Sequence, residues 1–373
     1  MSEVRVLGVE LRDFRTYTRG EASFGAGLTI VHGPNGAGKS NLLEALYFGC
    51  CARSPRTRNE RELVRFGCEA TRVTVRLAES DSGGEQHELS VGMEPGQPKR
   101  MMSDGAPVER LLDVPHRPLI SVFMPERLEL LKGAPGVRRA HLDQVVAALW
   151  PARAGDRRAY TRVLAQRNAL LGRIRAGAAS RESILTWDLQ LARHALALRE
   201  HRARAVKLLA EPFASRAAQL GLTGVASLEY RPRTRAHDEQ ELLAELRERL
   251  DSDLRRGFSG HGPHRDELAF LRDGRELRAY GSQGEQRLAL LALLLAERAV
   301  LADQRARMPL MLLDDVMSEL DADRRELLAC ELRSGGQSVI ATTDLAHVPG
   351  AGDPAVERLR VSSGVVLQEA LAA

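Results

Sequence analysis

The chain has 373 residues, of which 43% are apolar and 28% charged, so it can bury a sizeable core and is long enough for about two domains. The longest unbroken apolar run, Leu288 to Ala296, is far shorter than the roughly 20 residues that cross a bilayer. Charged residues occupy positions 3, 5 and 10, where a signal peptide would have its apolar core. These features argue against a membrane protein, and we expect a globular protein of the cytoplasm.

The four cysteines do not indicate a zinc site or a disulfide framework. Cys50, Cys51, Cys68 and Cys330 show no CxxC spacing, and adjacent cysteines make a poor disulfide. We therefore expect buried thiols that pack as small apolar side chains.

The formal net charge of +4 is unevenly distributed. Residues 151–260 contain 21 basic and 13 acidic side chains, and residues 157–210 contain 12 basic and 3 acidic ones. Such a segment is either a solvated helix face or a surface that binds a polyanion, and the composition leaves both interpretations open.

The N-terminal part of the chain is typical of strands around a glycine-rich loop. Alternating β-branched residues predict strands at 4–14 and 23–33, and a helix is expected at 39–51, directly after the loop. A strand, a glycine loop and a helix in this order form the usual context of a phosphate site. Further short strands are expected at 70–78, 87–93 and 99–105.

From about residue 157 the pattern becomes helical. Periodic side chains recur every three or four residues from Tyr160 to Ile174, and small residues at 176–180 interrupt them. Heptad-like spacing then continues from Leu185 to Ala210. We expect two antiparallel helices of roughly 20 residues each, which form an arm of only about 30 Å.

The rest of the chain mixes strands and helices. A strand is predicted at 225–231, a helix at 238–250, and a hairpin at 267–280 whose Asp273-Gly274 turn suits a tight reversal. After them we expect a loop and a buried helix at 281–303, an apolar strand within 308–321 that ends in two aspartates, and a strand at 337–344.

Residues 33–41 match a phosphate-binding pattern. Gly33, Gly38, Lys39 and Ser40 fit G-x-x-x-x-G-K-[ST], in which glycines let backbone N–H groups converge on phosphate oxygens at a helix N-terminus. Lys39 is one of only four lysines in an arginine-rich chain, and a flexible point charge suits this loop better than a planar guanidinium. We expect the loop to hold the phosphates of a nucleotide, with Ser40 offering its hydroxyl to Mg²⁺. The expected nucleotide-binding residues are Gly33, Pro34, Asn35, Gly36, Ala37, Gly38, Lys39, Ser40 and Asn41.

The stretch LMLLDD supplies the acidic partners that a P-loop needs at the end of a neighbouring strand. Asp314 is placed to hold Mg²⁺, and Asp315 is placed to polarise the attacking water. An apolar run ending in acids is, by itself, equally compatible with a strand followed by helix-capping aspartates, but the P-loop favours the catalytic interpretation. We therefore expect Asp315 and Lys39 to be catalytic, and Ser40 and Asp314 to be metal ligands.

The segment GSQGEQ, directly before a helix, resembles the signature loop of ABC-type ATPases, and DDVMSELD at 314–321 resembles their Walker B segment and D-loop. The resemblance implies that this loop closes on the nucleotide in the P-loop of another subunit, so that its helix N-terminus faces the γ-phosphate. The residues implied in that contact are Ser282, Gln283, Gly284 and Glu285.

The implied fold is α/β. It consists of an ABC-type ATPase head, with a P-loop mixed sheet and helices, and a second, largely helical lobe with a short antiparallel coiled-coil arm. We expect the first lobe at 1–115 with the P-loop, and the second at 116–304 with the arm at about 157–210 and the signature loop. Residues 305–373 are expected to complete the first lobe with the Walker B segment and D-loop.

Two positions depart from the ABC pattern. Thr343 stands where a switch histidine is expected, and Asp315 stands where many members have glutamate. Threonine cannot make the charged γ-phosphate contact and aspartate reaches less far toward the water, so we expect slow hydrolysis. The Q-loop glutamine has no clear counterpart, and its place is expected near residues 123–130.

Six stretches resemble one family, the bacterial recombination mediator RecF: residues 11–17, 54–67, 122–143, 262–268, 280–287 and 311–321. They occur in the family's order and extend over essentially the whole chain. The resemblance implies a relative of the SMC-like repair ATPases, with weak, DNA-stimulated ATP hydrolysis and ATP-dependent dimerisation. It also implies binding to duplex or gapped DNA, RecR and RecO as partners, and RecA loading in recombinational gap repair as the outcome.

A basic arm fits sequence-independent contact with duplex phosphates, whereas the low aromatic content, 4% of the chain, argues against a stacking platform for single strands. For Arg15 and Tyr17, contact with the nucleotide and simple burial are equally compatible with the sequence. For His264 and Arg265, a structured loop is favoured over contact with a ligand. The first candidates for DNA contact are Arg157, Arg158, Arg162, Arg173 and Arg175, and the second are Arg53, Arg56 and Arg58.

Two other classes of protein share part of this pattern. The ATP-binding subunit of an ABC transporter carries the same three motifs, but it normally keeps the switch histidine and lacks a basic helical arm. A structural SMC-like ATPase needs arms many times longer. The sequence therefore favours a DNA-repair clamp.

Overall fold

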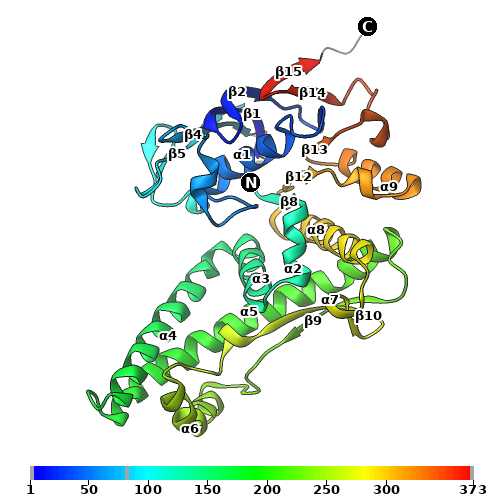
Figure 1. Ribbon diagram of the computed structural model, residues 1–373. Helices are drawn as coiled ribbons and strands as arrows, with labels where there is room; N and C mark the ends of the chain where they lie inside the picture. Colours follow the sequence, from blue (N-terminus) through cyan, green and yellow to red (C-terminus); the bar gives the residue numbers. More distant parts are fainter. Residues whose placement is uncertain (1–3, 80–83, 370–373) are drawn as a thin grey trace. The chain divides into compact units, whose positions relative to one another are not determined.

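The computed structural model describes residues 4–79 and 84–369, which form two compact units. Unit 1 contains the chain up to Leu128, Gln219–Gly221, and the chain from Glu297 onward. Unit 2 contains Glu129–Ala218 and Leu222–Ala296. Figure 1 shows that unit 1 combines the blue N-terminal and the orange to red C-terminal elements, whereas unit 2 is built from the green and yellow middle of the chain.

Unit 1 contains a six-stranded antiparallel sheet in the order β2-β1-β4-β5-β6-β7. Its strands alternate buried and more exposed residues; along β4, for example, Val73 and Val75 are buried, whereas their neighbours Arg72, Thr74 and Arg76 are more exposed. This alternation is typical of a sheet with one face on the core. The strands are β1 (Val4–Phe14), β2 (Tyr17–Ser23), β4 (Thr71–Glu79), β5 (Gln86–Met93), β6 (Arg100–Ser103) and β7 (Ala106–Pro107).

The second sheet of unit 1 has the order β15-β14-β3-β13-β12-β8. All neighbouring pairs are parallel except β14 with β15. Every residue of β12 and β13 is buried, as expected for parallel strands covered on both faces. The strands are β3 (Leu28–His32), β8 (Ile120–Phe123), β12 (Leu310–Asp314), β13 (Ser338–Thr342), β14 (Glu357–Ser362) and β15 (Val365–Glu369).

Helix α1 (Lys39–Cys51) lies between the two sheets of unit 1. It packs against β1, β4 and β5 on one side and against β12 and β13 on the other, within one continuous apolar core. A Cβ atom on Gly49 would lie only 2.4 Å from Cγ2 of Val75, so this glycine allows α1 to approach β4 closely. The close packing fixes the helix N-terminus at the end of β3.

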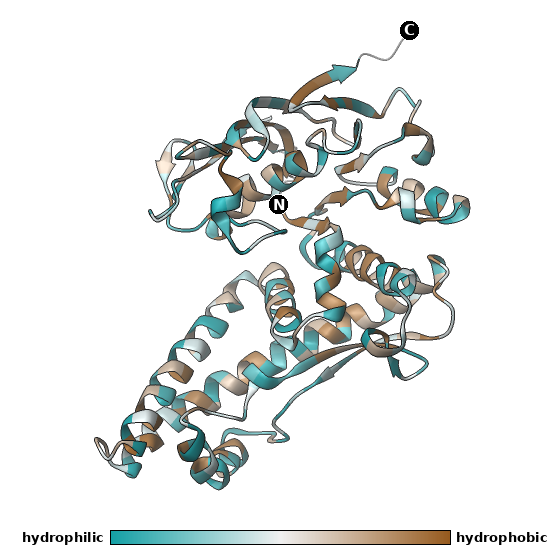
Figure 2. Cartoon of the chain, in the orientation of Figure 1, coloured by the Kyte–Doolittle hydropathy of each residue, from teal (hydrophilic) through white to brown (hydrophobic). Residues whose placement is uncertain are grey.

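The longest helices of unit 2 are amphipathic. Figure 2 shows hydrophobic and hydrophilic residues together along α4 and α5, as expected for helices with one buried face. A three-stranded antiparallel sheet in the order β11-β10-β9 accompanies them. The helices are α2 (Glu129–Lys132), α3 (Pro135–Leu149), α4 (Ala154–Arg175), α5 (Ile184–Gln219), α6 (Glu239–Arg256), α7 (Leu277–Tyr280) and α8 (Gln283–Arg305), and the strands are β9 (Ala226–Arg231), β10 (Glu267–Arg272) and β11 (Arg275–Glu276). The last residue of α5 and the part of α8 from Glu297 onward belong to unit 1.

The antiparallel arm expected from the sequence is formed by α4 and α5. Arg167 of α4 contacts Asp188 of α5, whereas Arg153 and Asp156, near the start of α4, contact His201 further along α5. Helix α4 has 22 residues and is about 33 Å long, but α5 has 36 residues and is much longer than expected.

Buried ion pairs join the elements of unit 2. Arg167, whose side chain is fully buried, donates hydrogen bonds to Asp188 at 2.6 Å, Asp253 at 2.8 Å and Ser259 at 2.7 Å, so it connects α4 with α5 and α6. Arg202 donates to both carboxylate oxygens of Asp143 in α3. Since each guanidinium lies inside a set of acceptors, these arginines stabilise the packing and are not part of a basic surface.

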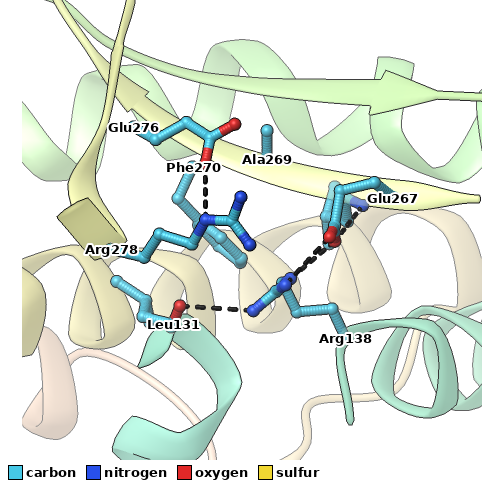
Figure 3. Close-up of a pocket in the computed structure, with 8 residues that line it drawn as sticks. Leu131, Arg138, Glu267, Ala269, Phe270, Glu276 and Arg278 are labelled. Carbon is cyan, nitrogen blue, oxygen red and sulfur yellow. Dashed lines mark hydrogen bonds and ion pairs between the residues drawn. The ribbon is translucent and has the colours of Figure 1, made fainter. Parts of the chain in front are cut away.

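Arg138 of α3 makes a third buried ion pair, with Glu267 of β10 (Figure 3). It donates to both carboxylate oxygens, at 2.6 and 2.9 Å, and to the carbonyl oxygens of Leu131 and Gly133 at 3.2 and 2.8 Å. The pocket beside this pair has a volume of only about 10 Å³. This is room for about one water molecule and not for a nucleotide, so the pair is structural.

Several local predictions were wrong. The strand expected at 23–33 begins only at Leu28, and the second half of the hairpin expected at 267–280 is mostly the short helix α7. Its Asp273-Gly274 turn is present, with φ values of 49° and 74°. Cys50 and Cys51 are buried as expected, but Cys68 is only partly buried and Cys330 is exposed. Across 4–79 and 84–369, no helix is long and apolar enough to cross a membrane.

Candidate nucleotide-binding site

The loop between β3 and α1 can be built only with glycine at two of its positions. Gly33 has φ 150°, and a Cβ atom there would lie 2.1 Å from the carbonyl oxygen of Val361 in β14. Gly38 has φ 116°, and a Cβ atom there would lie 2.9 Å from the hydroxyl of Tyr17. The glycines therefore let the loop pass close to β14 and to Tyr17.

Lys39, the first residue of α1, is folded over this loop. Its ammonium group donates hydrogen bonds to the carbonyl oxygens of Gly33 at 2.8 Å and Pro34 at 3.0 Å. Burial lowers the pKa of Lys39, whereas the nearby carboxylates of Asp314 and Asp315 raise it. The lysine is thus a buried cation close to two acids, a position from which it can turn toward an anionic ligand.

Asp314 ends β12, next to the loop, and is almost fully buried. Burial raises the pKa of its carboxyl group, and a hydrogen bond with the Ser40 side chain lowers it in part. A hydroxyl and a carboxylate in contact at a helix N-terminus are the oxygen donors that Mg²⁺ prefers. The two predicted metal ligands are therefore adjacent, and their chemistry fits the ion.

Asp315 has an unusual backbone and an incompletely satisfied side chain. Its φ is 50°, in the left-handed region, and Oδ1 is buried with no hydrogen-bond partner among the described residues. Its backbone N–H donates to the carbonyl oxygen of Ala341 at 3.0 Å, and the Ser318 hydroxyl donates to its carbonyl oxygen at 2.9 Å. Strained residues and unpaired buried polar atoms gather at functional sites, so this carboxylate is suited to a water or a ligand.

An ionic cluster that the sequence reasoning missed lies beside the loop. Glu44 of α1, whose side chain is fully buried, accepts hydrogen bonds from Arg15 at 2.9 Å and from Arg56 at 3.2 Å. Arg56 also donates to Asn41 and to Glu126, each at 3.0 Å. A single acid inside the apolar helix at 39–51 was the available signal, because a buried charge requires partners. The cluster holds Asn41 and the segment after β8 close to the loop.

Tyr17 and Arg15 are both tied to this region by contacts within the chain. The buried Tyr17 hydroxyl donates to the carbonyl oxygen of Gly38 at 3.0 Å, and burial raises its pKa. Arg15 has φ 52° and is engaged with Glu44. Tyr17 thus holds the glycine loop through Gly38, and Arg15 neutralises the buried carboxylate of Glu44.

The Q-loop position is expected in the segment after β8, where Glu126 accepts a hydrogen bond from Arg56 of the Glu44 cluster. Thr343, at the expected position of the switch histidine, is exposed just after β13. No glutamine occupies residues 123–130, so the side chain of this segment that reaches toward the loop is acidic. Burial is the main cause of the raised pKa of Asp314, and the negative charge of Glu126 raises that pKa further.

The signature-like loop forms a capped helix N-terminus in unit 2. The Ser282 backbone N–H donates to the Glu285 carboxylate at 2.7 Å, and the Glu285 N–H donates to the Ser282 hydroxyl at 3.3 Å. This reciprocal pattern is a capping box. Ser282, Gln283 and Gly284 are exposed, whereas Glu285 also pairs with Arg272. Three of the four predicted residues are therefore accessible, and the fourth shapes the loop.

Gln286, which the sequence reasoning did not single out, anchors the base of this loop. It is buried and donates to the carbonyl oxygens of Leu277 at 2.9 Å and Gly281 at 3.1 Å. These bonds connect the start of α8 to α7 and so hold the exposed loop residues Ser282, Gln283 and Gly284 in place.

The arginines expected to contact DNA differ in accessibility. On α4 all five candidates are exposed, and Arg157 also lies 3.0 Å from Asp143. Among the second group, Arg56 is held in the Glu44 cluster and Arg53 donates to the Tyr47 hydroxyl at 3.1 Å, whereas Arg58 is exposed. The exposed residues are Arg58, Arg157, Arg158, Arg162, Arg173 and Arg175.

His264 and Arg265 belong to a structured loop. His264 Nδ1 lies 2.6 Å from the Tyr160 hydroxyl, Nε2 lies 2.9 Å from the carbonyl oxygen of Ser259, and burial lowers the pKa of the imidazole. The Arg265 guanidinium lies over the Phe258 ring, 5.5 Å from its centre. Both side chains thus have partners within unit 2.

The family of the chain follows from comparison with known proteins. The family described as RecF/RecN/SMC N terminal domain matches residues 5–355. The DNA replication and repair protein RecF of Synechococcus sp. (strain JA-3-3Ab) is 36% identical over 369 residues, which are 96% of this chain and 96% of the relative. The chain belongs to the RecF family.

Other RecF comparisons agree with this assignment. RecF of Acidothermus cellulolyticus is 37% identical and covers 90% of this chain and 92% of the relative. A solved structure described as the recombination mediator protein RecF-ATP in the RecFOR pathway is 26% identical, with a TM-score of 0.88 and coverage of 99% and 98%. The predicted ABC-type ATPase head with a helical arm is confirmed.

Proposed function

We propose that the chain is an ATP-dependent DNA-binding clamp of recombinational gap repair. The observation that carries the proposal is the convergence of Lys39, the Ser40–Asp314 pair and the unpartnered Asp315 oxygen around one glycine loop. A cation, a hydroxyl–carboxylate pair and a free carboxylate oxygen are the groups that a nucleoside triphosphate requires for binding and hydrolysis. The RecF–ATP structure supports ATP as the nucleotide.

In this proposal, Lys39 turns from the carbonyl oxygens of its loop to the phosphates, while the loop N–H groups bind phosphate oxygens. Ser40 and Asp314 would hold Mg²⁺, which neutralises the charge of the β- and γ-phosphates when it is bound. Asp315 orients the attacking water and accepts its proton. Because aspartate is short and Thr343 cannot supply a charged contact, hydrolysis is slow and acts as a timer for release.

The exposed capping residues of α8 support a dimer closed by ATP. Ser282 and Gly284 lie at the N-terminus of a 23-residue helix, where the dipole and free N–H groups attract anions. We infer that this loop of one copy contacts the γ-phosphate bound to the P-loop of a second copy. ATP then contributes directly to the dimer interface.

The exposed arginines of α4 support duplex DNA as the polyanion. Exposed guanidinium groups on a helix of about 33 Å can contact phosphates without reading bases, and such binding weakens with salt. The RecFOR pathway named for the solved RecF neighbour supports RecR and RecO as partners. RecA loading is the outcome that the family resemblance implies.

The test is fluorescence anisotropy of a labelled duplex that contains a single-stranded gap, titrated with the chain with and without ATP. Tighter binding with ATP that weakens steeply as salt rises would support the clamp. The release of phosphate with and without the gapped duplex would measure DNA stimulation. If the duplex does not bind, or binds equally well without ATP, DNA is not the ligand of an ATP-dependent clamp. That result would favour a transporter-type or structural ATPase.

A further inference from the structure

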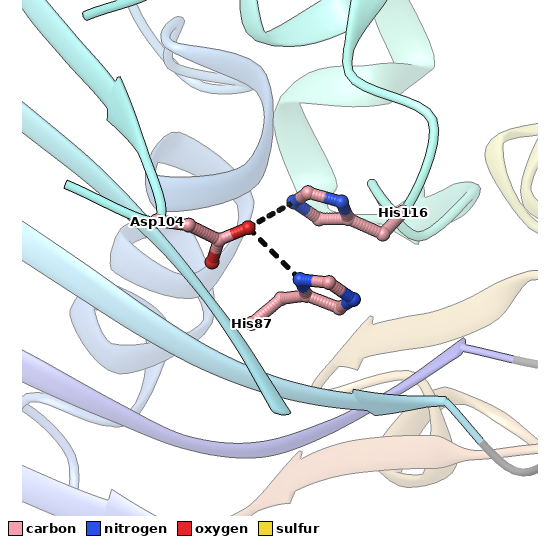
Figure 4. Close-up of side chains that lie close together, drawn as sticks. All are labelled: His87, Asp104 and His116. Atoms are coloured by element: carbon pink, nitrogen blue, oxygen red, sulfur yellow. Dashed lines mark hydrogen bonds and ion pairs between the residues drawn. The ribbon is translucent and has the colours of Figure 1, made fainter. Parts of the chain in front are cut away.

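Three side chains that can bind metal meet at the edge of the antiparallel sheet of unit 1, and none of them belongs to the proposed nucleotide site. His87 lies on β5, Asp104 lies in the turn between β6 and β7, and His116 lies in the loop before β8 (Figure 4). One ligand atom from each residue lies within 4.8 Å of the others. Asp104 Oδ2 is 2.9 Å from His87 Nδ1 and 3.6 Å from His116 Nε2.

A hydrogen bond from the backbone of Glu88 orients the Asp104 carboxylate toward the two imidazoles. Asp104 has φ 50°, and its Oδ1 accepts a hydrogen bond from the Glu88 N–H at 2.8 Å, which leaves Oδ2 to face the histidines. Burial raises its pKa, but the Glu88 N–H and the two histidines outweigh burial, so the net shift is downward. An ionised carboxylate with one oxygen fixed by the backbone and one oxygen free is a suitable metal ligand.

The two imidazoles are close enough that they cannot both be charged without strong repulsion. Their ring centres are 3.8 Å apart and the rings are nearly parallel, with an angle of 4° between them. Burial, followed by the charge of His87, lowers the pKa of His116. Each histidine side chain is only 13% exposed. The cluster therefore places two imidazoles beside one carboxylate, which is a donor set typical of zinc and related ions.

We propose that His87 Nδ1, Asp104 Oδ2 and His116 Nε2 bind one divalent transition-metal ion, with Zn²⁺ as the best-matched ion. Three protein ligands with solvent in the fourth position satisfy tetrahedral zinc. The ion would connect β5, the turn at Asp104 and the loop that leads to β8, and this use is independent of ATP.

The site must rearrange slightly to bind the ion. Because the rings are parallel, their nitrogen lone pairs lie in separate planes, and one ring has to turn about its Cβ–Cγ bond to reach a common point. For His116 this turn breaks the contact between Nε2 and the Ser103 hydroxyl, 2.9 Å apart. On His87 the other ring nitrogen lies 3.9 Å from the Glu79 carboxylate, which can orient the ring once Nδ1 binds the ion.

The first experiment is a Zn²⁺ titration of the whole chain without nucleotide, in competition with a chromophoric chelator. We expect one equivalent of zinc in the wild type, none at this affinity in His116→Gln or Asp104→Asn, and one in the control His237→Gln, which replaces an exposed histidine of unit 2. Zinc should also raise the Tm of the wild type and control but not of the two site variants. Equal binding by all four chains would overturn the site.

Two measurements on the wild type keep the proposal testable if the variants do not fold. Co²⁺ should give visible bands without the intense near-ultraviolet thiolate bands that binding at Cys68 or Cys330 would produce. Zinc should also protect His87 and His116 from modification by diethylpyrocarbonate, as read by mass spectrometry. Thiolate bands, or equal modification of these histidines with and without zinc, would contradict the proposal.

Discussion

The ammonium group of Lys39 lies 2.8 Å from the carbonyl oxygen of Gly33, on the same loop that the lysine would help to close around a phosphate. Phosphate binding therefore exchanges one set of hydrogen bonds for another. We predict that Lys39→Met weakens ATP binding by at least about 10-fold, because a hydrogen bond to a charged group contributes about 1.5–3 kcal/mol. The apo protein should keep or slightly gain stability, since a buried, desolvated cation is removed.

This prediction is checked by titration with a fluorescent ATP analogue together with a thermal melt of the apo protein. An unchanged affinity for ATP would contradict the assignment of Lys39 to the phosphates. A large loss of apo stability would show that the two loop contacts are its main role.

Gly33 and Gly36 provide a matched pair for testing the geometry of the loop. Gly33→Ala should lower the free energy of unfolding by about 3 kcal/mol or more, because the new Cβ would collide with the carbonyl oxygen of Val361 and φ is 150°. Gly36→Ala should cost only about 1–2 kcal/mol, since φ is 77° but nothing lies within 4 Å. Urea unfolding of the apo variants measures both, and equal costs would argue against the close approach of the loop to β14.

Asp314 should make the apo protein less stable at neutral pH. Its pKa is raised in the folded state, mainly by burial, so the native chain holds the proton more tightly than the unfolded chain does. Stability therefore falls as pH rises from the unfolded value of about 3.9 through the raised pKa. We predict that Asp314→Asn raises the apo Tm near pH 7 and that this gain shrinks toward pH 4.

The same variant should lose the additional stability that ATP gives in the presence of Mg²⁺. Thermal melts across pH, with and without Mg²⁺ and ATP, separate the two effects. An Asn variant that is less stable than the wild type at neutral pH would contradict the sign of the shift.

Asp315→Asn should keep ATP binding but reduce hydrolysis by about 100-fold, because a general base contributes about 10²–10⁴-fold. Single-turnover release of phosphate gives the rate, and nucleotide titration gives the affinity. Asp323→Asn, at an exposed position in α9 (Ala322–Arg333), is the control and should hydrolyse ATP normally. A wild-type rate in Asp315→Asn would assign the base to another residue.

Ser282→Arg should bind ATP normally but fail to dimerise, because a large side chain would occupy the exposed loop at the start of α8. Loss of its capping hydroxyl costs about 1 kcal/mol, too little to unfold the chain. Sedimentation with ATP measures the dimer, and Ser180→Arg at an exposed position is the control. If Ser282→Arg dimerises with ATP as tightly as the wild type, the result would contradict the proposed geometry of the clamp.

The sequence identified the parts of the site that depend on local patterns. The glycine loop, Lys39 and the two aspartates after an apolar strand were recognisable because each motif lies within a few residues. The Glu44 cluster was not, since it depends on arginines that are distant in sequence, 29 residues away in the case of Arg15. The helical turn of α7 was read as a strand because four residues carry too little periodicity to decide.

The basic segment shows a limit of counting charges along a sequence. Counting charges cannot distinguish Arg158, which is exposed, from Arg167 and Arg202, which are buried against acids that lie outside their own helical turns. The clue was that Arg167 falls on the periodic stripe of α4 together with Tyr160 and Val163. An arginine on an apolar stripe is better interpreted as a buried ion pair than as surface charge.

The position of β3 in its sheet has a consequence for synthesis on the ribosome. Its two neighbours, β13 and β14, come from Ser338–Thr342 and Glu357–Ser362, and the carbonyl group of Val361 borders the glycine loop. The strand that leads into the loop is made early but remains unpaired while about 300 further residues are added. A growing chain therefore cannot complete the proposed phosphate pocket until β14 has left the exit tunnel, so nucleotide binding at this loop would have to follow the synthesis of β14.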